Sequence, residues 1–170
     1  MSSTLTAMDQ LWLSFRLLLL LAAANGSPIV AKRVLGARWC MPLDGGVRFF
    51  DGRPLLGPSK TVRGAIAAHV ATALAAPVLG IPIGLGALIG VAAMTGDALS
   101  SFIKRRLGVA PSAQAVGLDQ IPEALLPLLA VQGPLGLSPL QIVGITLLFF
   151  VLEIPFAQLF YRLGIRDTPH

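Results

Sequence analysis

The chain is 170 residues long, and its length and composition already exclude several classes of protein. Only 12% of the residues are charged and 55% are hydrophobic, with a mean hydropathy of +0.78, whereas an average soluble domain has about 25% charged residues. A soluble chain this short has too little interior to bury so much apolar surface. The single cysteine, Cys40, excludes a scaffold held by internal disulfides. The composition therefore predicts a polytopic membrane protein.

The net charge of +5 comes from 13 Lys and Arg residues against 8 Asp and Glu residues, and it bears first on orientation in a membrane. A nucleic-acid surface needs a basic strip with aromatic residues among the charges. The aromatic side chains here lie mostly in apolar runs, such as Phe149, Phe150, Phe156 and Phe160. We therefore expect a lipid bilayer around the chain and no nucleic-acid partner.

Five stretches have the composition of membrane-crossing helices, which need about 20 mostly apolar residues. Their ranges are 10–31, 61–79, 83–101, 121–131 with an extension to 135, and 140–163. Pro and Gly residues mark the turn between the last two stretches. The sequence thus predicts an all-α integral membrane protein with five transmembrane helices, in a single membrane-embedded domain over residues 1–170.

The first stretch contains Arg16 and Asn25 and is too polar for a simple anchor. We expect Asn25 and Pro28 to break this helix, because proline removes a backbone hydrogen bond, and the broken end would present an amide to a lipid headgroup. A secretory signal peptide is an alternative interpretation, since Arg16 precedes the apolar run 17–24 and small residues follow it. The equally hydrophobic remainder of the chain favours a membrane span.

Basic residues indicate the orientation, because short cytoplasmic loops carry an excess of Lys and Arg. Twelve of the 13 basic residues lie within 32–63, at 104–106, or at 162 and 166, and the hairpins around 80–83 and 132–139 contain none. We therefore expect the first loop, the third loop and the C-terminus to be cytoplasmic and the N-terminus to lie outside. Five crossings place the two termini on opposite sides of the membrane, as this arrangement requires, and four crossings do not.

The first cytoplasmic loop, residues 32–64, is longer than a simple connection needs, and such loops are usually functional or disordered. Its glycines allow a close approach of the backbone to a ligand. The segment GPSKT, from Gly57 to Thr61, places backbone amides, Lys60 and a hydroxyl at a helix N-terminus, which is typical of a phosphate site. It lacks the spacing of a Walker A motif. The alternative is a positively charged cap that only orients the helix.

The segment GDALSSFIKRRLG, residues 96–108, follows the third stretch. If it is helical, Asp97, Ser100 or Ser101, and Lys104 share one face. A carboxylate there can hold a divalent ion while the cations bind phosphate oxygens, and Asp119 offers a second carboxylate. Such hard oxygen ligands suit Mg²⁺, while one Cys and two His do not make a zinc site. The plainer alternative is that the basic residues only anchor the helix and that Asp97 is a hydrogen-bonded carboxylate at a helix end.

Two acidic residues, Glu123 and Glu153, fall inside predicted membrane helices. Charges at that depth are costly and are functional candidates by default. Either one could instead pair with Arg16 or with an amide at a helix end. His69, in the second stretch, is more typical of a packed residue than of a catalytic base.

Four ordered segments together resemble the CDP-archaeol synthase family. They are AANGSP (23–28), PLDGGVRFFDGRPLLGPSKTVRG (42–64), GDALSSFIKRRLG (96–108) and LDQIPEAL (118–125). The segment SSFIKRR with a following Asp is also similar to a shortened signature of the phosphatidate cytidylyltransferases, without their Lys-Asp pair and Gly-rich tail. The resemblance implies a five-helix membrane enzyme that transfers CMP from CTP to a lipid phosphate with Mg²⁺ and releases pyrophosphate. The lipid is either an archaetidic-acid-type ether lipid or a phosphatidate-like one.

The resemblance and the chemistry of the residues give each candidate a role. Asp97 and Asp119 are the expected ligands of Mg²⁺. The triphosphate or the lipid phosphate is expected to be bound by Lys60, Thr61, Arg63, Lys104 and Arg105. Four of these residues are the expected catalytic set: Asp97, Lys104, Asp119 and Lys60. Asn25 is expected to bind the lipid headgroup, and Asp44 and Asp51 are expected to fix the first loop or to recognise the ribose or cytosine. The other expected substrate contacts are Pro28, Gly57, Ser100 and Ser101.

Two rival functions belong to other classes. A small transporter or lipid scramblase would line a polar path with Glu153, Glu123 and Arg16, but it often has repeated halves, and we find no internal repeat. A lipid phosphatase would need a nucleophile or a His base beside the basic cluster. The sequence favours the transferase over both, and it leaves the oligomeric state, including a homodimer, open.

Overall fold

The computed structural model describes residues 6–110 and 115–162, and all regular secondary structure within them is helical. The helices are α1 (Ala7–Leu35), α2 (Val62–Val78), α3 (Ile83–Arg106), α4 (Gln120–Leu135) and α5 (Pro139–Arg162). Each corresponds to one of the five predicted stretches, so the prediction of an all-α chain is confirmed. The predicted end of the last stretch, Leu163, lies outside the described residues.

The ends of two helices follow from local capping. Thr6 and Asp9 form a reciprocal capping box at the start of α1, which satisfies amides that the first turn leaves unpaired. The Thr61 hydroxyl accepts a hydrogen bond from the Gly64 amide at 3.2 Å and so begins α2. α1 ends at Gly36, whose φ of 55° is a conformation that glycine adopts easily.

The predicted break in the first helix is wrong, because α1 continues through both Asn25 and Pro28. The Asn25 amide donates to the Leu21 carbonyl at 3.0 Å and stays within the helix. A Cβ on Gly64 would lie 3.3 Å from the Pro28 Cβ, so α2 packs directly against the proline. A proline removes only one helical hydrogen bond, and packing against a neighbouring helix holds α1 together at this point.

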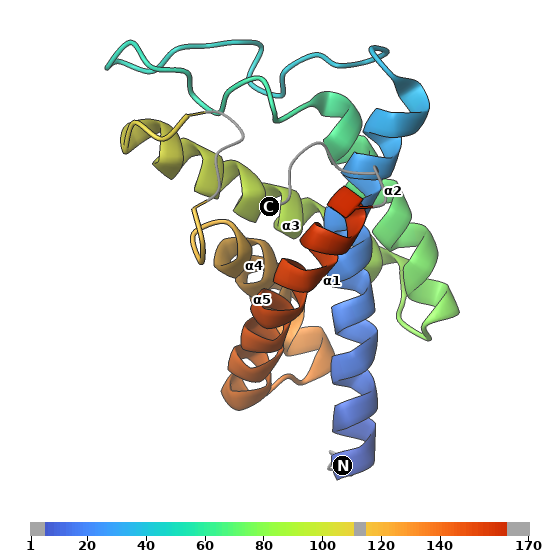
Figure 1. Cartoon of the computed structure of the whole chain (residues 1–170). Coiled ribbons are helices and arrows are strands. Elements are labelled where there is room, and N and C mark those ends of the chain that lie inside the picture. The colour runs from blue at the N-terminus through green and yellow to red at the C-terminus, as the bar shows by residue number, and fades with distance from the viewer. Residues whose placement is uncertain (1–5, 111–114, 163–170) are drawn as a thin grey trace.

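The helices form a bundle whose loops gather at one end (Figure 1). This loop end carries residues 36–61 and the segment after α3, whereas the start of α1 and the α2–α3 turn lie at the opposite end. Small residues let the helices approach closely: a side chain on Gly86 or Gly90 of α3 would overlap α2. The apolar core joins all five helices through residues such as Leu20, Ala76, Ile89, Leu128 and Phe149.

The outer surface of the bundle is apolar, as the bilayer requires. Leu11, Val78 and Leu140 are 68%, 86% and 81% exposed. Within the described residues, three segments are long and apolar enough to cross a membrane: α1, α3 and Pro139–Gln158 of α5. α2 is also apolar but has 17 residues, or roughly 25 Å of helix.

Candidate active site

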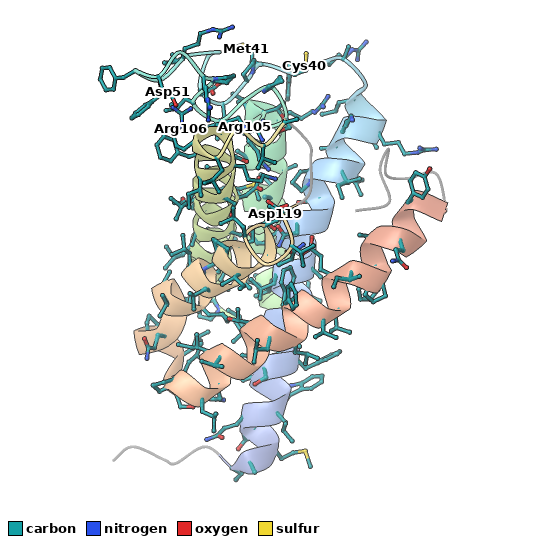
Figure 2. The ribbon with its side chains drawn as sticks, turned by 60° about the vertical axis from the view of Figure 1, so that its left-hand side comes forward. Cys40, Met41, Asp51, Arg105, Arg106 and Asp119 are labelled. Carbon is teal, nitrogen blue, oxygen red and sulfur yellow. The ribbon has the colours of Figure 1, made fainter. Side chains whose placement is uncertain are left out.

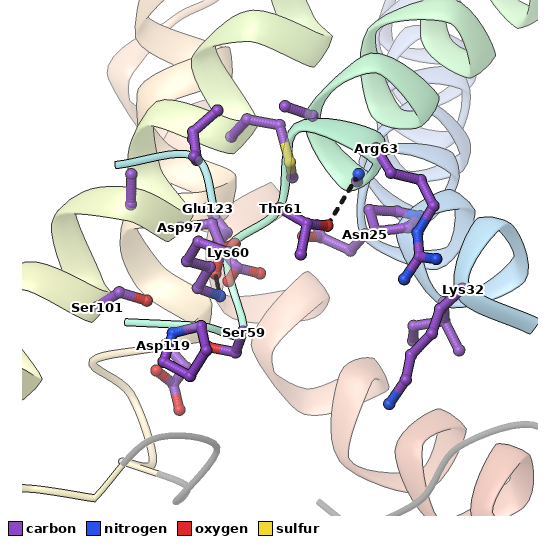
Figure 3. Close-up of a pocket in the computed structure, with 18 of the residues that line it drawn as sticks. Asn25, Lys32, Ser59, Lys60, Thr61, Arg63, Asp97, Ser101, Asp119 and Glu123 are labelled. Carbon is purple, nitrogen blue, oxygen red and sulfur yellow. Dashed lines mark hydrogen bonds and ion pairs between the residues drawn. The ribbon is translucent and has the colours of Figure 1, made fainter. Parts of the chain in front are cut away.

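A cavity of about 830 Å³ lies at the loop end of the bundle and takes its walls from α1 to α5 and from both loops (Figure 3). Six basic side chains line it: Lys32, Arg33, Lys60, Arg63, Lys104 and Arg105. Four acidic side chains also line it: Asp97, Asp119, Glu123 and Glu153. The lining therefore has a formal excess of two positive charges, which favours an anionic ligand.

Lys60, from the segment before α2, forms an ion pair with Asp97 in the second half of α3. Both side chains are about one-fifth exposed, at 21% and 18%, and both face the cavity. The neighbouring Thr61 also lines the cavity, but its hydroxyl accepts the Gly64 amide that starts α2 (Figure 3). The GPSKT segment thus brings a cation to a carboxylate 37 residues further along the chain.

Lys104 and Asp119 form a second pair of this kind. The Lys104 Nζ lies 2.7 Å from the Asp119 Oδ1, and the aspartate also accepts the Ala115 amide at 2.9 Å. Lys104 is on α3, two turns beyond Asp97, and Asp119 precedes α4. Each predicted metal ligand therefore contacts one of the predicted catalytic lysines.

Glu123 of α4 contacts Asp97 through their carboxyl groups, which lie within hydrogen-bonding reach of each other. The contact depends on Gly96, where a Cβ would overlap the backbone of Pro122 and push α4 away from α3. Glu123 is only 8% exposed. Sequence analysis identified Glu123 as a charge inside a membrane helix but did not include it in the expected site. Glu123 nevertheless follows Asp119 by one helical turn.

Two arginines reach the cavity in different ways. Arg105 is 4% exposed, and its Nη2 donates to the Ala110 carbonyl at 2.9 Å. Its Nε and Nη1 are buried and make no hydrogen bond within the described part of the chain, so they are donors suited to an anion. Arg63 instead donates through Nη1 to the carbonyls of Gly36 and Arg38, and so closes the end of α1.

Four predicted contacts do not line the cavity: Asp44, Asp51, Gly57 and Ser100. Asp44 accepts the amides of Gly46, Leu56 and Gly57 at 2.9, 2.8 and 3.2 Å and folds the first loop around itself. Partial burial raises the pKa of Asp44, but these backbone hydrogen bonds outweigh burial and hold its pKa below the ordinary value. The Ser100 hydroxyl donates to the carbonyls of Gly96 and Leu118 and ties α3 to the start of α4.

Asp51 belongs to a clasp that holds the first loop on the end of α3 (Figure 2). It forms an ion pair with Arg106, whose guanidinium also lies over the rings of Phe49 and Phe102, at 4.7 and 5.1 Å from the ring centroids. Arg53 donates to the Arg106 carbonyl at 2.6 Å. The clasp positions the loop that carries Lys60 and is itself outside the cavity.

The remaining predicted residues of the site, Asn25, Pro28 and Ser101, do line the cavity. Sequence reasoning missed Lys32 and Arg33, which it used only to orient the bundle, and it missed Ser59 and Gln120. The signal for Ser59 was its place inside GPSKT. Gln120 follows Asp119, and its side-chain oxygen accepts the Gly117 amide at 2.8 Å.

The carboxylates fit a hard divalent cation that is shared with a substrate. Among residues 6–110 and 115–162, no three side chains of His, Cys, Asp or Glu lie close enough together to enclose an ion. A magnesium site needs only one or two protein carboxylates, with substrate phosphates and water as the other ligands. Asp97, in contact with Glu123, supplies such a partial set inside the cavity.

Arg16 does not extend this polar cavity into a path across the bundle. Its guanidinium lies 5.1 Å from the Trp12 ring centroid and packs against Gly80 in the α2–α3 turn. It precedes Asn25 by roughly 13 Å of helix, and buried leucines such as Leu20 and Leu21 lie between them. This arrangement gives no support to the transporter alternative.

Several known proteins resemble this chain in sequence and in fold. A family model described as "CarS-like: CDP-archaeol synthase" matches residues 8–170. The CDP-archaeol synthase of Sulfurisphaera tokodaii is 36% identical over 152 residues, which are 86% of this chain and 88% of that protein. The Thermofilum pendens enzyme of the same name is 32% identical over 86% of this chain and 74% of its own length.

Two further matches complete the comparison. The Hyperthermus butylicus CDP-archaeol synthase is 43% identical over 108 residues, and this match spans 58% of the chain and 60% of that relative, less than two thirds of its length. A solved structure described as an intramembrane enzyme for archaeal membrane lipids biosynthesis is 35% identical, with a TM-score of 0.68 over 83% of this chain and 90% of that one. Taken with the helical bundle and its charged cavity, these matches show that the chain belongs to the CDP-archaeol synthase family.

Proposed function

We propose that this integral membrane protein transfers CMP from CTP to the phosphate of a membrane lipid and so makes a CDP-activated lipid and pyrophosphate. The observation that carries the proposal is the cavity of about 830 Å³, whose excess of basic side chains lies where the loops meet the apolar helices. The family name supports an archaetidic-acid-type ether lipid as the acceptor. A phosphatidate-like ester lipid has the same phosphate and is the second candidate.

The reaction joins two anions, so positive charge and positioning are its main requirements. An oxygen of the lipid phosphate attacks the α-phosphorus of CTP, the new P–O bond forms, and the bond to the β-phosphate breaks as pyrophosphate leaves. Lys60, Lys104 and Arg105 are the proposed partners of the phosphates, with Arg63 and Thr61 at the edge of the site. No general base is needed, because the lipid phosphate is already ionised at neutral pH.

Mg²⁺ is the proposed metal, and when bound it neutralises charge on the triphosphate. Asp97 and Asp119 are its proposed ligands, and the contact between Asp97 and Glu123 adds Glu123 to the donor set. Each carboxylate is already held beside a lysine or a second carboxyl group. The protein thus presents these oxygens from Asp97 on α3, Glu123 on α4 and Asp119 directly before α4.

We also propose that the chain is one domain, residues 1–170, with five membrane crossings, cytoplasmic loops 36–61 and 107–119, and an N-terminus outside. Support comes from the basic residues at the loop end and from the position of the start of α1 at the other end (Figure 1). CTP is a cytoplasmic substrate in this arrangement. Whether the protein forms a homodimer stays open, as in the sequence analysis.

The decisive experiment incubates the purified protein with α-³²P-labelled CTP and with lipid phosphates of the ether and ester types. We expect labelled CDP-lipid and pyrophosphate only when Mg²⁺ and a lipid phosphate are both present. Consumption of CTP without lipid, or full activity in excess chelator, contradicts the proposal. The relative rates with the two lipids decide between the ether and ester acceptors.

A further inference from the structure

The tip of the first loop is a short, ordered turn over residues 47–54, which we name the tip hairpin. The Phe49 amide donates to the Arg53 carbonyl at 2.8 Å, and the Gly52 amide donates to the Phe49 carbonyl at 2.9 Å. Gly52 has a φ of 75°, which glycine adopts easily in such a tight turn. The turn leaves Phe50 at its outer corner, where the side chain is 99% exposed.

The tip hairpin is attached to the outer face of α3. Leu88 and Leu99, which are 39% and 44% exposed, lie three helical turns apart on this face. Phe102 and Arg106 continue the same face toward the loop end, since Arg106 follows Leu99 by two turns. The ring of Phe49 packs edge-on against Phe102, with the centroids 5.4 Å apart. The hairpin therefore extends a surface of α3 that faces lipid further down the helix.

Three phenylalanine rings form a row that leads away from the bundle. Phe102 contacts Phe49, and Phe49 contacts Phe50 with the ring centroids 5.1 Å apart. The exposed fraction rises along the loop part of this row, from 37% at Phe49 to 99% at Phe50. A phenylalanine held outward on a fixed turn is unfavourable in water and favourable at the boundary between lipid headgroups and acyl chains. The row thus points to a lipid contact at its outer end.

The charges around the tip hairpin suit an anionic lipid surface. Residues 47–54 and Arg106 contain three arginines and one aspartate, which gives a formal charge of +2. Arg48 is exposed, and its Nη1 donates to the Gly52 carbonyl at 2.8 Å, so its guanidinium stays at the tip. The ion pair between Asp51 and Arg106 holds the hairpin at the loop end of α3 (Figure 2). Arginine beside exposed aromatic side chains is typical of a segment bound among lipid headgroups.

We propose that the tip hairpin is a membrane-surface anchor, in which Phe50 enters the headgroup region of the bilayer beside α3 and Arg48 faces anionic headgroups. The occupant of this surface is the bilayer that already surrounds the helices, because the hairpin continues the exposed face of α3. The anchor lies outside the charged cavity and goes beyond the proposed reaction. It gives the first loop, which also carries Lys60, a fixed position relative to the membrane surface.

A first experiment measures the depth of residue 50. Phe50→Cys in a Cys40→Ser background is labelled with the fluorophore NBD and placed in nanodiscs whose lipids carry a spin label just below the headgroup. We expect a blue-shifted emission and quenching by about twofold or more. Met41→Cys is the matched control, because Met41 is 68% exposed in the same loop but lies apart from Asp51 and Arg106 (Figure 2). Unquenched probes at both positions, or equal quenching at both, would overturn the proposal.

A second experiment tests the charge and the occupant. Quenching at position 50 should be stronger in anionic than in neutral nanodiscs, and high salt or Arg48→Gln should reduce that difference. Equal quenching in the two lipids would overturn the role of Arg48. A probe that is shielded from water without quenching by lipid would assign the surface to a second copy of the chain and overturn the anchor. Neither measurement uses CTP or turnover, so failure of the anchor and failure of the proposed function are separate results.

Discussion

Asp97 contacts side chains from two other parts of the charged cavity. It sits beside Gly96, forms an ion pair with Lys60 and contacts Glu123, so that α3, α4 and the first loop meet at one carboxylate. Because it is the proposed metal ligand, Asp97→Asn keeps the size of the side chain and removes the charge that Mg²⁺ needs. We expect kcat to fall by roughly 10² or more, with little change in thermal stability in detergent.

The matched control for this variant is Asp51→Asn, because Asp51 is also ion-paired but lies outside the cavity, and the backbone hydrogen bonds of Arg53 and Arg106 still hold the loop on α3 without its charge. We expect its kcat to stay within a few-fold of the wild type. If Asp97→Asn lowers stability while activity per folded molecule stays near normal, Asp97 is a structural residue.

Two adjacent serines test the geometry more finely. Ser101 lines the cavity, whereas Ser100 is fully buried and bonded to the Gly96 and Leu118 carbonyls. We expect Ser100→Ala to lower the free energy of unfolding by about 1 kcal/mol and to leave the KM for CTP unchanged. Ser101→Ala should raise that KM at nearly normal stability, as measured by thermal unfolding and initial rates. If Ser100→Ala raised the KM for CTP and Ser101→Ala lowered the stability, the orientation of these two side chains on α3 would be contradicted.

At the scale of elements, the sequence was sufficient for the helices and insufficient for their contacts. Hydropathy and Gly/Pro punctuation located the five segments because they are local properties. They failed at Pro28, since packing against Gly64 holds the helix together there. The Lys60–Asp97 pair joins residues 37 positions apart, and no local pattern determines it.

The α3–α4 contact gives a prediction about an element. Gly96→Ala places a methyl group against the Pro122 carbonyl, so α4 must move away and Glu123 must lose contact with Asp97. We expect a loss of stability of about 1–3 kcal/mol and a clear fall in kcat. Gly84→Ala on the same helix meets nothing within 4 Å and should be neutral or slightly stabilising. Equal effects of the two substitutions on Tm would refute this account of the contact.

At the scale of the whole molecule, the proposed topology determines which face meets CTP. In a Cys40→Ser background, a membrane-impermeant thiol reagent applied from outside should label Ser138→Cys and miss Val47→Cys. Both positions are exposed, and the segments that contain them, the first loop and the α4–α5 turn, lie toward opposite ends of the bundle (Figure 1). The opposite labelling pattern would invert the orientation and remove cytoplasmic access to the cavity.

The two Lys–Asp pairs have a thermodynamic consequence. Lys60 and Lys104 are already paired with Asp97 and Asp119. A poorly hydrated carboxylate without a counterion is costly. Neither lysine can therefore leave its carboxylate for a phosphate unless another cation binds that carboxylate. Nucleotide and metal should therefore exchange these counterions together, and their binding should be linked. Linkage is reciprocal: calorimetric titration should show CTP raising the affinity for Mg²⁺ by the same factor by which Mg²⁺ raises the affinity for CTP, and Lys60→Met should weaken that coupling.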